Sequence, residues 1–342
     1  MTHPAKSSPL LAVKNLITDV AGVAVGNAAD ASLGSGVTAV LFDEPAVAAV
    51  DVRGGGPGTR ESDLLGPNTT VERIDAIAVS GGSAFGLEAA AGIMAWLAEQ
   101  GRGFAVGSAL VPIVPGAILF DLLSISDNRW GRYPPYRELG HAAAADAGRA
   151  FPLGSAGAGM GATTQNLKGG LGSASARTSS GHVVGALAAV NAVGRVTVGD
   201  GPHFWAAPLE VGGEFGGLGL PSPLPAEAHT VRLKGEEPRA NTTPCVVATD
   251  AVLTKAQVAR IAVMASAGMA RAIYPVFSPL DGDVVFAVAT GKRPLKDPVI
   301  DLAHIGAAAA NCLARAIARG VYEATALPFP GALPSWRERF GD

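Results

Sequence analysis

The chain has 342 residues, enough for two average domains or for one large layered domain. Hydrophobic residues make up 48% and charged residues only 16%, which excludes a disordered protein, because disorder requires low hydrophobicity and high charge. The formal net charge is −3 and no run of basic residues is present, so the electrostatic footprint of a nucleic-acid-binding protein is missing.

Cysteine usage and hydropathy indicate the compartment. Two cysteines, Cys245 and Cys312, are too few for a disulfide framework. Residues 10–13 are too short for the apolar part of a signal peptide, and no small-residue cleavage site follows them. The most apolar stretch, residues 104–123, contains two prolines and an aspartate, whereas a membrane-spanning helix needs about 20 apolar residues. We therefore expect a cytoplasmic protein without a membrane partner.

Short apolar runs alternate with glycine and proline in the first 150 residues. Four of these runs are predicted to be strands: residues 23–25, 36–42, 46–52 and 74–79. The glycine-rich segment 81–86 leads into a predicted helix over residues 87–100, whose apolar side chains recur every three or four positions. Alanine-rich residues 142–150 predict a second helix.

The second half of the chain changes from irregular to regular. It begins with a glycine-dense stretch, residues 154–172, a predicted strand pair at 183–190 and 195–198, and a glycine- and proline-rich loop at 212–225. The polar segment 233–241 is predicted to be an exposed boundary. A predicted strand, helix, strand and helix then follow at residues 245–249, 254–272, 283–289 and 302–321. Intermixed strands and helices indicate the α/β or α+β class.

Common catalytic and cofactor motifs are absent from the sequence. There is no phosphate-binding P-loop, and the glycine-rich residues 154–161 lack the strand–turn–helix frame of a dinucleotide site. The six histidines are scattered without the spacing of zinc ligands, and no G-x-S-x-G motif occurs. We expect neither a metal nor a cofactor. A histidine-based triad stays open, although no pattern points to one.

The junction Asn241-Thr242-Thr243 lies between the polar segment and a predicted buried strand. Local chemistry alone favours a threonine-rich turn that leads into the strand. The alternative is a latent N-terminal nucleophile, because cleavage before Thr242 would free its α-amine beside its own hydroxyl. An α-amine has a pKa of about 8, so it can act as a general base near neutral pH without a histidine.

Eight short blocks between residue 17 and about residue 320 carry a family resemblance. They are residues 17–26, 50–55, 81–87, 111–115, 157–162, 168–172, 241–250 and 281–283. In this order they resemble the P1-type self-processing peptidases, which comprise the L-aminopeptidase/D-esterases, the β-peptidyl aminopeptidases and the nylon-oligomer endohydrolases. Eight blocks in family order make the resemblance specific, and it favours the nucleophile interpretation of Thr242.

The resemblance implies a fold, an activity and an assembly. The fold is α+β, a four-layer α-β-β-α sandwich resembling the N-terminal-nucleophile hydrolases. One catalytic domain, residues 1–342, would be cut between Asn241 and Thr242 into a large chain, 1–241, and a small chain, 242–342. The activity would be hydrolysis of a peptide or other amide, aminopeptidase- or amidase-like, through an acyl-enzyme on Thr242. The partners would be a small peptide or amide substrate and other copies, in a homo-oligomer of at least four processed heterodimers.

Two carboxylates are expected beside the nucleophile. Thr242 precedes one predicted strand, and Asp281-Gly282-Asp283 precedes the next. If these strands are parallel neighbours, they begin at the same sheet edge, where the carboxylates would tune the proton balance of Thr242. The alternative is a plain hairpin turn or a fragment resembling a calcium loop. The better-known aminopeptidases have a serine where Asp281 stands, which leaves the substrate open.

The resemblance also assigns roles to five residues away from the starts of these two strands. Asn191 matches a family asparagine whose amide would stabilise the oxyanion, and Lys168 matches a family lysine that would hold or polarise groups near the nucleophile. A turn residue and a solvated loop charge are the alternatives. Gly82 and Ser83 belong to a backbone wall expected near the substrate, with a structural role as the alternative. Phe120 stands where the nylon hydrolases have a tyrosine, so a phenolic donor is missing here.

The sequence leaves two other functions open. One is acyl transfer by an N-terminal threonine, as in the ornithine acetyltransferases, although their characteristic blocks are not evident. The other is an unprocessed binding or scaffold protein that keeps the fold. Transfer of an acyl group to an amine rather than to water would identify the first, and a chain that stays whole would favour the second.

Overall fold

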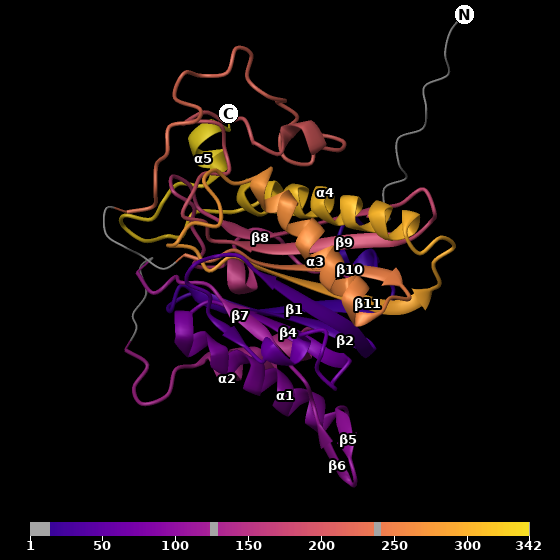
Figure 1. Ribbon diagram of the computed structural model, residues 1–342. Helices are drawn as coiled ribbons and strands as arrows, with labels where there is room; N and C mark the ends of the chain where they lie inside the picture. The colour runs from indigo at the N-terminus through magenta and orange to yellow at the C-terminus, as the bar shows by residue number, and fades with distance from the viewer. Residues whose placement is uncertain (1–13, 124–128, 236–240, 342) are drawn as a thin grey trace, which may run out of the picture.

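The computed structural model describes residues 14–123, 129–235 and 241–341, which form four layers (Figure 1). Helices α3 (Lys255–Ala270) and α4 (Ile300–Tyr322) cover one outer face, and α1 (Ala89–Glu99) and α2 (Tyr136–Ala145) cover the other. Two layers of strands lie between these helix pairs. This arrangement confirms the predicted α-β-β-α sandwich.

The strand layer beside α1 and α2 is built on β2. Its strands are β1 (Val23–Asp30), β2 (Ser35–Val52), β3 (Thr59–Arg60), β4 (Arg73–Ser80) and β7 (Gly116–Ile118). The other layer holds β8 (Gly170–Arg177), β9 (Val183–Val190), β10 (Pro244–Ala251) and β11 (Val284–Arg293). The first part of β2 pairs with β1 and β4 and its last part pairs with β11, so β2 joins the two layers.

The described chain also contains short elements. The hairpin of β5 (Phe104–Val106) and β6 (Ala109–Val111) projects from the end of α1, and α5 (Trp336–Phe340) lies near the C-terminus. Within the described residues, no helix is both long and apolar enough to cross a membrane.

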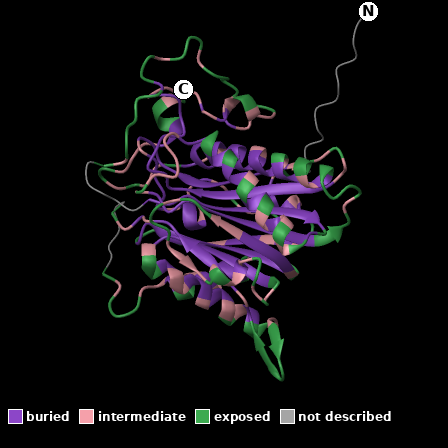
Figure 2. Cartoon of the chain, in the orientation of Figure 1, coloured by how far each residue is buried: buried purple, intermediate pink, exposed green. Residues whose placement is uncertain are grey.

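Three apolar layers fill the spaces between the four structural layers, as the buried residues of Figure 2 show. Side chains of β10 illustrate the pattern: Cys245 and Val247 pack toward α3 and α4, whereas Val246 and Ala248 pack between the strand layers. Successive residues of a strand point to opposite faces, and both faces are buried here. This burial explains why residues 244–248 of β10 form a continuous apolar run in the sequence.

Strand β8 differs from the prediction, because it begins inside the glycine-dense stretch, where the sequence pattern indicates a loop. Glycine is unfavourable in a strand interior unless another backbone approaches closely. A side chain on Gly172 would overlap the carbonyl oxygen of Ala316 in α4, so the glycine allows the helix to pack directly on the strand.

Other boundaries also differ from the predictions. The predicted strand 46–52 is the second part of β2 and not a separate element. The predicted helix 142–150 is α2, which begins at Tyr136 because the buried face of the helix starts at that side chain. Residues 195–198 make only isolated bridges, to Tyr274 and Phe204, while β9 pairs with β8 and β10. Most of the segment 81–86 belongs to a 3-10 helix, Ser83–Glu88, which precedes α1.

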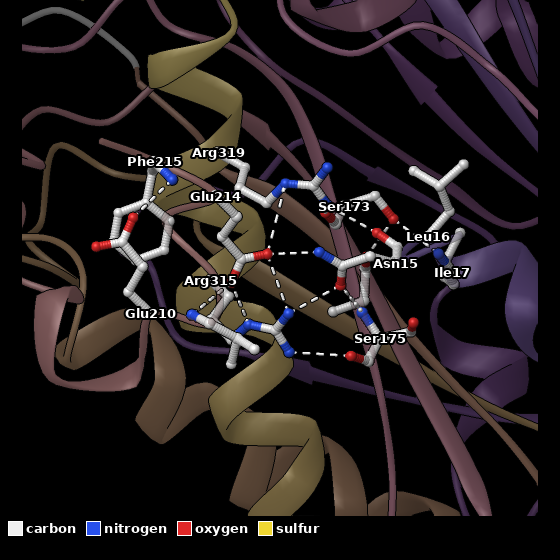
Figure 3. A network of polar contacts seen from close by, with 12 residues as sticks. Asn15, Leu16, Ile17, Ser173, Ser175, Glu210, Glu214, Phe215, Arg315 and Arg319 are labelled. Atoms are coloured by element: carbon white, nitrogen blue, oxygen red, sulfur yellow. Dashed lines mark hydrogen bonds and ion pairs between the residues drawn. The ribbon is translucent and has the colours of Figure 1, made fainter. Parts of the chain in front are cut away.

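A buried polar network joins α4 to segments that precede it in the chain (Figure 3). The Nε and Nη2 atoms of Arg315 lie 2.5 and 3.0 Å from the carboxylate oxygens of Glu214. Arg315 also donates to the side chain of Asn15 at 2.8 Å and to the carbonyl of Ser175 at 2.9 Å. Arg315 and Glu214 are 4% and 8% exposed, so this ion pair is shielded from solvent. It connects residues on opposite sides of the Asn241–Thr242 bond.

Candidate active site

The first residues of β10 and β11 lie side by side. The two strands are parallel neighbours, with Pro244 opposite Val284, and Asn241 forms a parallel bridge with Asp281 just before them. The expected arrangement of the two strands is therefore confirmed. It brings Thr242 next to the Asp281–Asp283 turn at one edge of the sheet.

The peptide bond between Asn241 and Thr242 is buried and held by hydrogen bonds. The Thr242 hydroxyl donates to the Asn241 carbonyl oxygen at 2.6 Å, and the Gly282 amide donates to the same oxygen at 2.5 Å. The Thr242 amide donates to the carbonyl of Asn191 at 3.1 Å, and the Asn241 amide donates to that of Leu280 at 3.0 Å. Thus a hydroxyl and a backbone N–H donate to one carbonyl oxygen of the bond that the sequence predicts to be cleaved.

Asp283 is buried and bound to the backbone of Thr243, the residue that follows the candidate nucleophile Thr242. One carboxylate oxygen accepts from the Thr243 amide at 2.9 Å, and the other accepts from the Phe277 amide at 3.2 Å. Burial, and then the nearby charge of Asp281, raise the pKa of Asp283 to about 8. Burial also raises the pKa of Asp281. Because the two carboxyls repel each other when both are ionised, the pair readily keeps a proton at neutral pH.

Asp281 is fixed by its own turn and by a glycine loop. Its carboxylate accepts from the Val193 amide at 3.1 Å and from the Ser278 hydroxyl at 2.9 Å. The amides of Gly56 and Gly54 donate to the backbone carbonyls of the two aspartates at 2.8 and 3.1 Å. A side chain on Gly54 would overlap this backbone, which explains the glycine at position 54.

Asn191, which follows β9, has a side chain of fixed orientation. Its Oδ1 accepts from the Thr163 amide at 3.1 Å and from Lys234 Nζ at 2.9 Å. Its Nδ2 donates to the Phe120 carbonyl at 3.1 Å. One of the two N–H groups of the carboxamide is thereby bound, and the described residues provide no partner for the other. That second N–H can donate to a further acceptor.

Lys168 is buried and points into its own loop. Its ammonium donates to the carbonyls of Gly159, Ala162 and Gly169 at 2.8 to 2.9 Å, so all three N–H donors are used. Burial lowers the pKa of Lys168 to about 7. In this geometry Lys168 holds the loop that carries Thr163, and it is joined to Asn191 through that loop.

A cavity of about 260 Å³ adjoins the Asn241 side of the cleavage bond. Phe120 lines it, together with Thr163, Gln165 and Lys234. The predicted residues Gly82 and Ser83 do not line it. Their amides donate instead to a carboxylate oxygen of Asp121 at 2.7 Å and to the carbonyl of Leu119 at 2.9 Å.

Several residues of this region are not among those predicted from the sequence. Thr163 and Lys234 contact Asn191, and Asp121 is buried beside Phe120. A signal for Asp121 existed, because it is a carboxylate inside the most apolar stretch of the chain. Buried carboxylates are rare unless they are paired or hydrogen-bonded. Within the described residues, no three histidine, cysteine, aspartate or glutamate side chains gather as a metal site.

Comparison with known proteins decides the family. Residues 15–332 match the family model of peptidase family S58. The chain belongs to peptidase family S58. It is therefore a hydrolase of amide bonds.

Relatives of this S58 peptidase include proteins of two kinds. An uncharacterized aminopeptidase of Mycobacterium tuberculosis (strain ATCC 25618 / H37Rv) is 44% identical over 350 residues, which cover 95% of this chain and 98% of that protein. The 6-aminohexanoate-oligomer endohydrolase of Kocuria sp. (strain KY2) is 28% identical over 284 residues, which cover 81% of this chain and 75% of that protein.

Solved structures confirm the fold of the S58 peptidase. A β-aminopeptidase of Burkholderia sp. superposes with a TM-score of 0.72 at 21% identity, over 97% of this chain and 93% of that one. The L-aminopeptidase D-Ala-esterase/amidase of Ochrobactrum anthropi, described as a variant of the Ntn hydrolase fold, has a TM-score of 0.71 at 20% identity, over 98% and 97% of the two chains. The S58 peptidase therefore has this fold.

Proposed function

We propose that the protein is a self-processing amide hydrolase that cuts its own Asn241–Thr242 bond and then uses Thr242 as an N-terminal nucleophile. One observation carries the proposal: the Thr242 hydroxyl and the Gly282 amide both donate to the Asn241 carbonyl oxygen, at 2.6 and 2.5 Å. The hydroxyl oxygen is thus next to the carbonyl that it would attack. The amide occupies the position of an oxyanion donor.

Self-cleavage would proceed as an N-to-O acyl shift followed by hydrolysis. Thr242 Oγ attacks the Asn241 carbonyl carbon, and the hydroxyl proton passes to the Asp281–Asp283 pair. The Gly282 N–H stabilises the oxyanion. The C–N bond then breaks, the Thr242 nitrogen takes up a proton as an amine, and Asn241 is left as an ester on Oγ. Water hydrolyses this ester, which gives the Asn241 carboxylate and a free Thr242.

Turnover of a substrate would repeat the same chemistry with a new base. The α-amine of Thr242 accepts the hydroxyl proton as Oγ attacks the substrate carbonyl. The proton passes to the leaving amine, water attacks the acyl-enzyme, and the carboxylic acid product leaves. The Asn191 carbonyl, which accepts from the Thr242 amide in the uncut chain, would hold the new amine. The second N–H of the Asn191 carboxamide would assist the oxyanion, while Lys168 keeps its loop in place.

The substrate class that we propose is a small peptide or aminoacyl amide. Names of the relatives support it, because one is an aminopeptidase and another cleaves amide bonds of 6-aminohexanoate oligomers. The cavity of about 260 Å³ on the Asn241 side is the proposed place of the acyl group, because Asn241 is the acyl donor in self-cleavage. Phe120 lines it, and Gly82 and Ser83 support its wall through Asp121 and Leu119.

Intact-mass measurement of the purified protein tests the proposal. The wild type should give two pieces, and the smaller should begin with Thr242-Thr243-Pro244. Thr242→Ala should stay whole and inactive, whereas Thr242→Ser, which keeps a hydroxyl, should still be cut. Mature enzyme should release 4-nitroaniline from at least one member of a panel of aminoacyl and 6-aminohexanoyl 4-nitroanilides. A Thr242→Ala protein with wild-type maturation and turnover would refute the nucleophile assignment.

A further inference from the structure

Asp121 is a buried carboxylate whose two oxygens are both bound. Oδ1 accepts from the Gly82 amide and Oδ2 accepts from the Ser35 hydroxyl, each at 2.7 Å. Tyr136 donates to the same Ser35 oxygen at 3.2 Å. Both partners of the carboxylate are donors, which suits an acceptor-only group, and Asp121 is only 2% exposed.

Two glycines next to the Asp121 carboxylate leave no room for side chains of their own. A side chain on Gly81 would overlap carboxylate oxygen Oδ2, and a Cβ on Gly161 would lie 2.7 Å from it. These glycines belong to two of the sequence blocks, 81–87 and 157–162. The two blocks therefore form a cradle for the Asp121 side chain.

The anchored residues on both sides of Phe120 hold its peptide group. Leu119 donates to the Ser80 carbonyl at 2.8 Å and accepts from the Ser83 amide at 2.9 Å, while Asp121 is held by its carboxylate. The Phe120 carbonyl between them accepts from Asn191 Nδ2 at 3.1 Å. Thus the direction in which the Asn191 carboxamide points depends on a peptide that Asp121 fixes.

Charge connects Asp121 to the same carboxamide from its other side. The carboxylate interacts electrostatically with Lys168 and Lys234. Lys234 donates to Asn191 Oδ1, and Lys168 holds the loop whose Thr163 amide donates to that same oxygen. Asp121 therefore acts on both ends of the Asn191 carboxamide, through the Phe120 carbonyl and through these two cations.

We propose that Asp121 is a positioning residue of the active site, which fixes the Asn191 carboxamide so that its second N–H faces the reacting carbonyl. The inference rests on the proposed function, in which this N–H assists the oxyanion. Asp121 binds Ser35 and Gly82, so it acts on the reacting groups through other residues. Its effect should therefore appear in the rate of the chemical step and not in substrate affinity.

Asp121→Asn tests the inference, because it removes the charge with little change of shape. Asp75→Asn is the matched control: Asp75 is also 2% exposed and accepts from the Ile113 amide at 2.9 Å, but it lies at the other end of β4. The readouts are the rate of self-cleavage by intact mass, the melting temperature, and kcat and KM for the best nitroanilide of the panel. If no nitroanilide is cleaved, the self-cleavage rate decides.

Asp121→Asn should lower self-cleavage and kcat by about tenfold or more and leave KM within about twofold, since small displacements in an active site have effects of up to about 10²-fold. Asp75→Asn should lower the melting temperature and change both rates by less than about twofold. If Asp121→Asn does not fold, Ser35→Ala, which removes one anchor, should slow self-cleavage by at least about threefold. Wild-type rates in a folded Asp121→Asn, or in Ser35→Ala when only that variant folds, would overturn the inference. A wild type that stays whole would instead refute the proposed function.

Discussion

The Thr242 hydroxyl packs against Gly282 so closely that a side chain at position 282 would overlap it. Gly282 is outside the left-handed region, so its backbone conformation alone would accept an alanine. A Cβ at this position would also lie 2.6 Å from the Gly56 carbonyl oxygen, so both the nucleophile and the neighbouring glycine loop require the absence of a side chain. Gly282 also supplies the amide that donates to the Asn241 carbonyl.

We expect Gly282→Ala to slow self-cleavage by at least about tenfold, because the new methyl group displaces the hydroxyl from the carbonyl that it attacks. Time-resolved intact mass measures the rate. Gly56→Ala is the control, since a Cβ there would have no neighbour closer than 3.8 Å. Equal rates for Gly282→Ala and the wild type would contradict the assigned position of the hydroxyl.

Asp281→Asn and Asp283→Asn should each slow self-cleavage and substrate turnover by about 10²-fold, because both reactions need the same hydroxyl activated. Rates of the two reactions should fall in parallel. Asp301→Asn is a control for the loss of a hydrogen-bonded carboxylate away from the site, and it should leave both rates near the wild type. If both single variants keep normal kinetics, Asp281-Gly282-Asp283 is only a turn.

Stability of the uncut chain should depend on pH through Asp283. Its pKa is raised to about 8, mainly by burial, so the folded state keeps a proton that the unfolded state releases above about pH 4. The stabilisation that this proton gives to the folded state is fully present below about pH 4 and is lost as the pH rises to about 8. For one proton, the free energy of unfolding falls by at most about 1.4 kcal/mol per pH unit.

Urea unfolding between pH 5 and 8 in the Thr242→Ala background, where all chains stay whole, measures this dependence. Adding Asp283→Asn should flatten the pH profile over this range. Above about pH 7, Lys168 makes the free energy of unfolding rise with pH. Burial lowers the pKa of Lys168 to about 7, so the folded state then binds fewer protons than the unfolded state. A slope that is unchanged by Asp283→Asn would contradict the raised pKa.

The buried ion pair of Arg315 and Glu214, which lie on opposite sides of the Asn241–Thr242 bond, should stabilise the folded chain. Glu214→Ala leaves a buried guanidinium without its partner, and we expect a loss of about 3–5 kcal/mol in the free energy of unfolding. Glu323→Ala removes the half-buried partner of the exposed Arg337 and should change the free energy of unfolding by less than about 1 kcal/mol. Denaturant unfolding in the Thr242→Ala background measures the free energy of unfolding of both variants. If both variants lose a similar free energy of unfolding, burial of the Arg315–Glu214 pair has no energetic consequence.

Assembly into a homo-oligomer of at least four processed heterodimers also stays a prediction. The β5–β6 hairpin exposes four apolar side chains by 42% to 60%: Phe104, Val106, Leu110 and Val111. Soluble monomers rarely expose such contiguous apolar patches, and closed symmetry is the usual arrangement that covers them. Light scattering at micromolar concentration should give a mass of four or more chains. The mass of one chain would rule out the assembly.

Elements with strong periodicity are predictable from the amino-acid sequence. From β10 to α4 the order is strand, helix, strand, helix. The two strands are short apolar runs because both of their faces are buried. The two helices have apolar side chains every three or four residues because one face of each helix is buried. The sequence also placed Thr242 and Asp281 directly before neighbouring strands, and family blocks gave the layered fold. Strand β8 is not predictable in this way. Its glycines allow close packing against α4, and this tertiary contact leaves no local pattern in the sequence.

Tertiary structure alone decided how the side chains of the site are held. Asp121 binds Ser35 and Gly82, which lie 86 and 39 positions away, so no spacing in the sequence relates them. Lys168 has the residue type of a catalytic group, yet its three donors are bound to carbonyls that only the folded loop brings together. Local patterns report burial and turns, because these depend on neighbouring residues. The direction of a buried polar group depends on partners from distant segments, and folding alone places them around it.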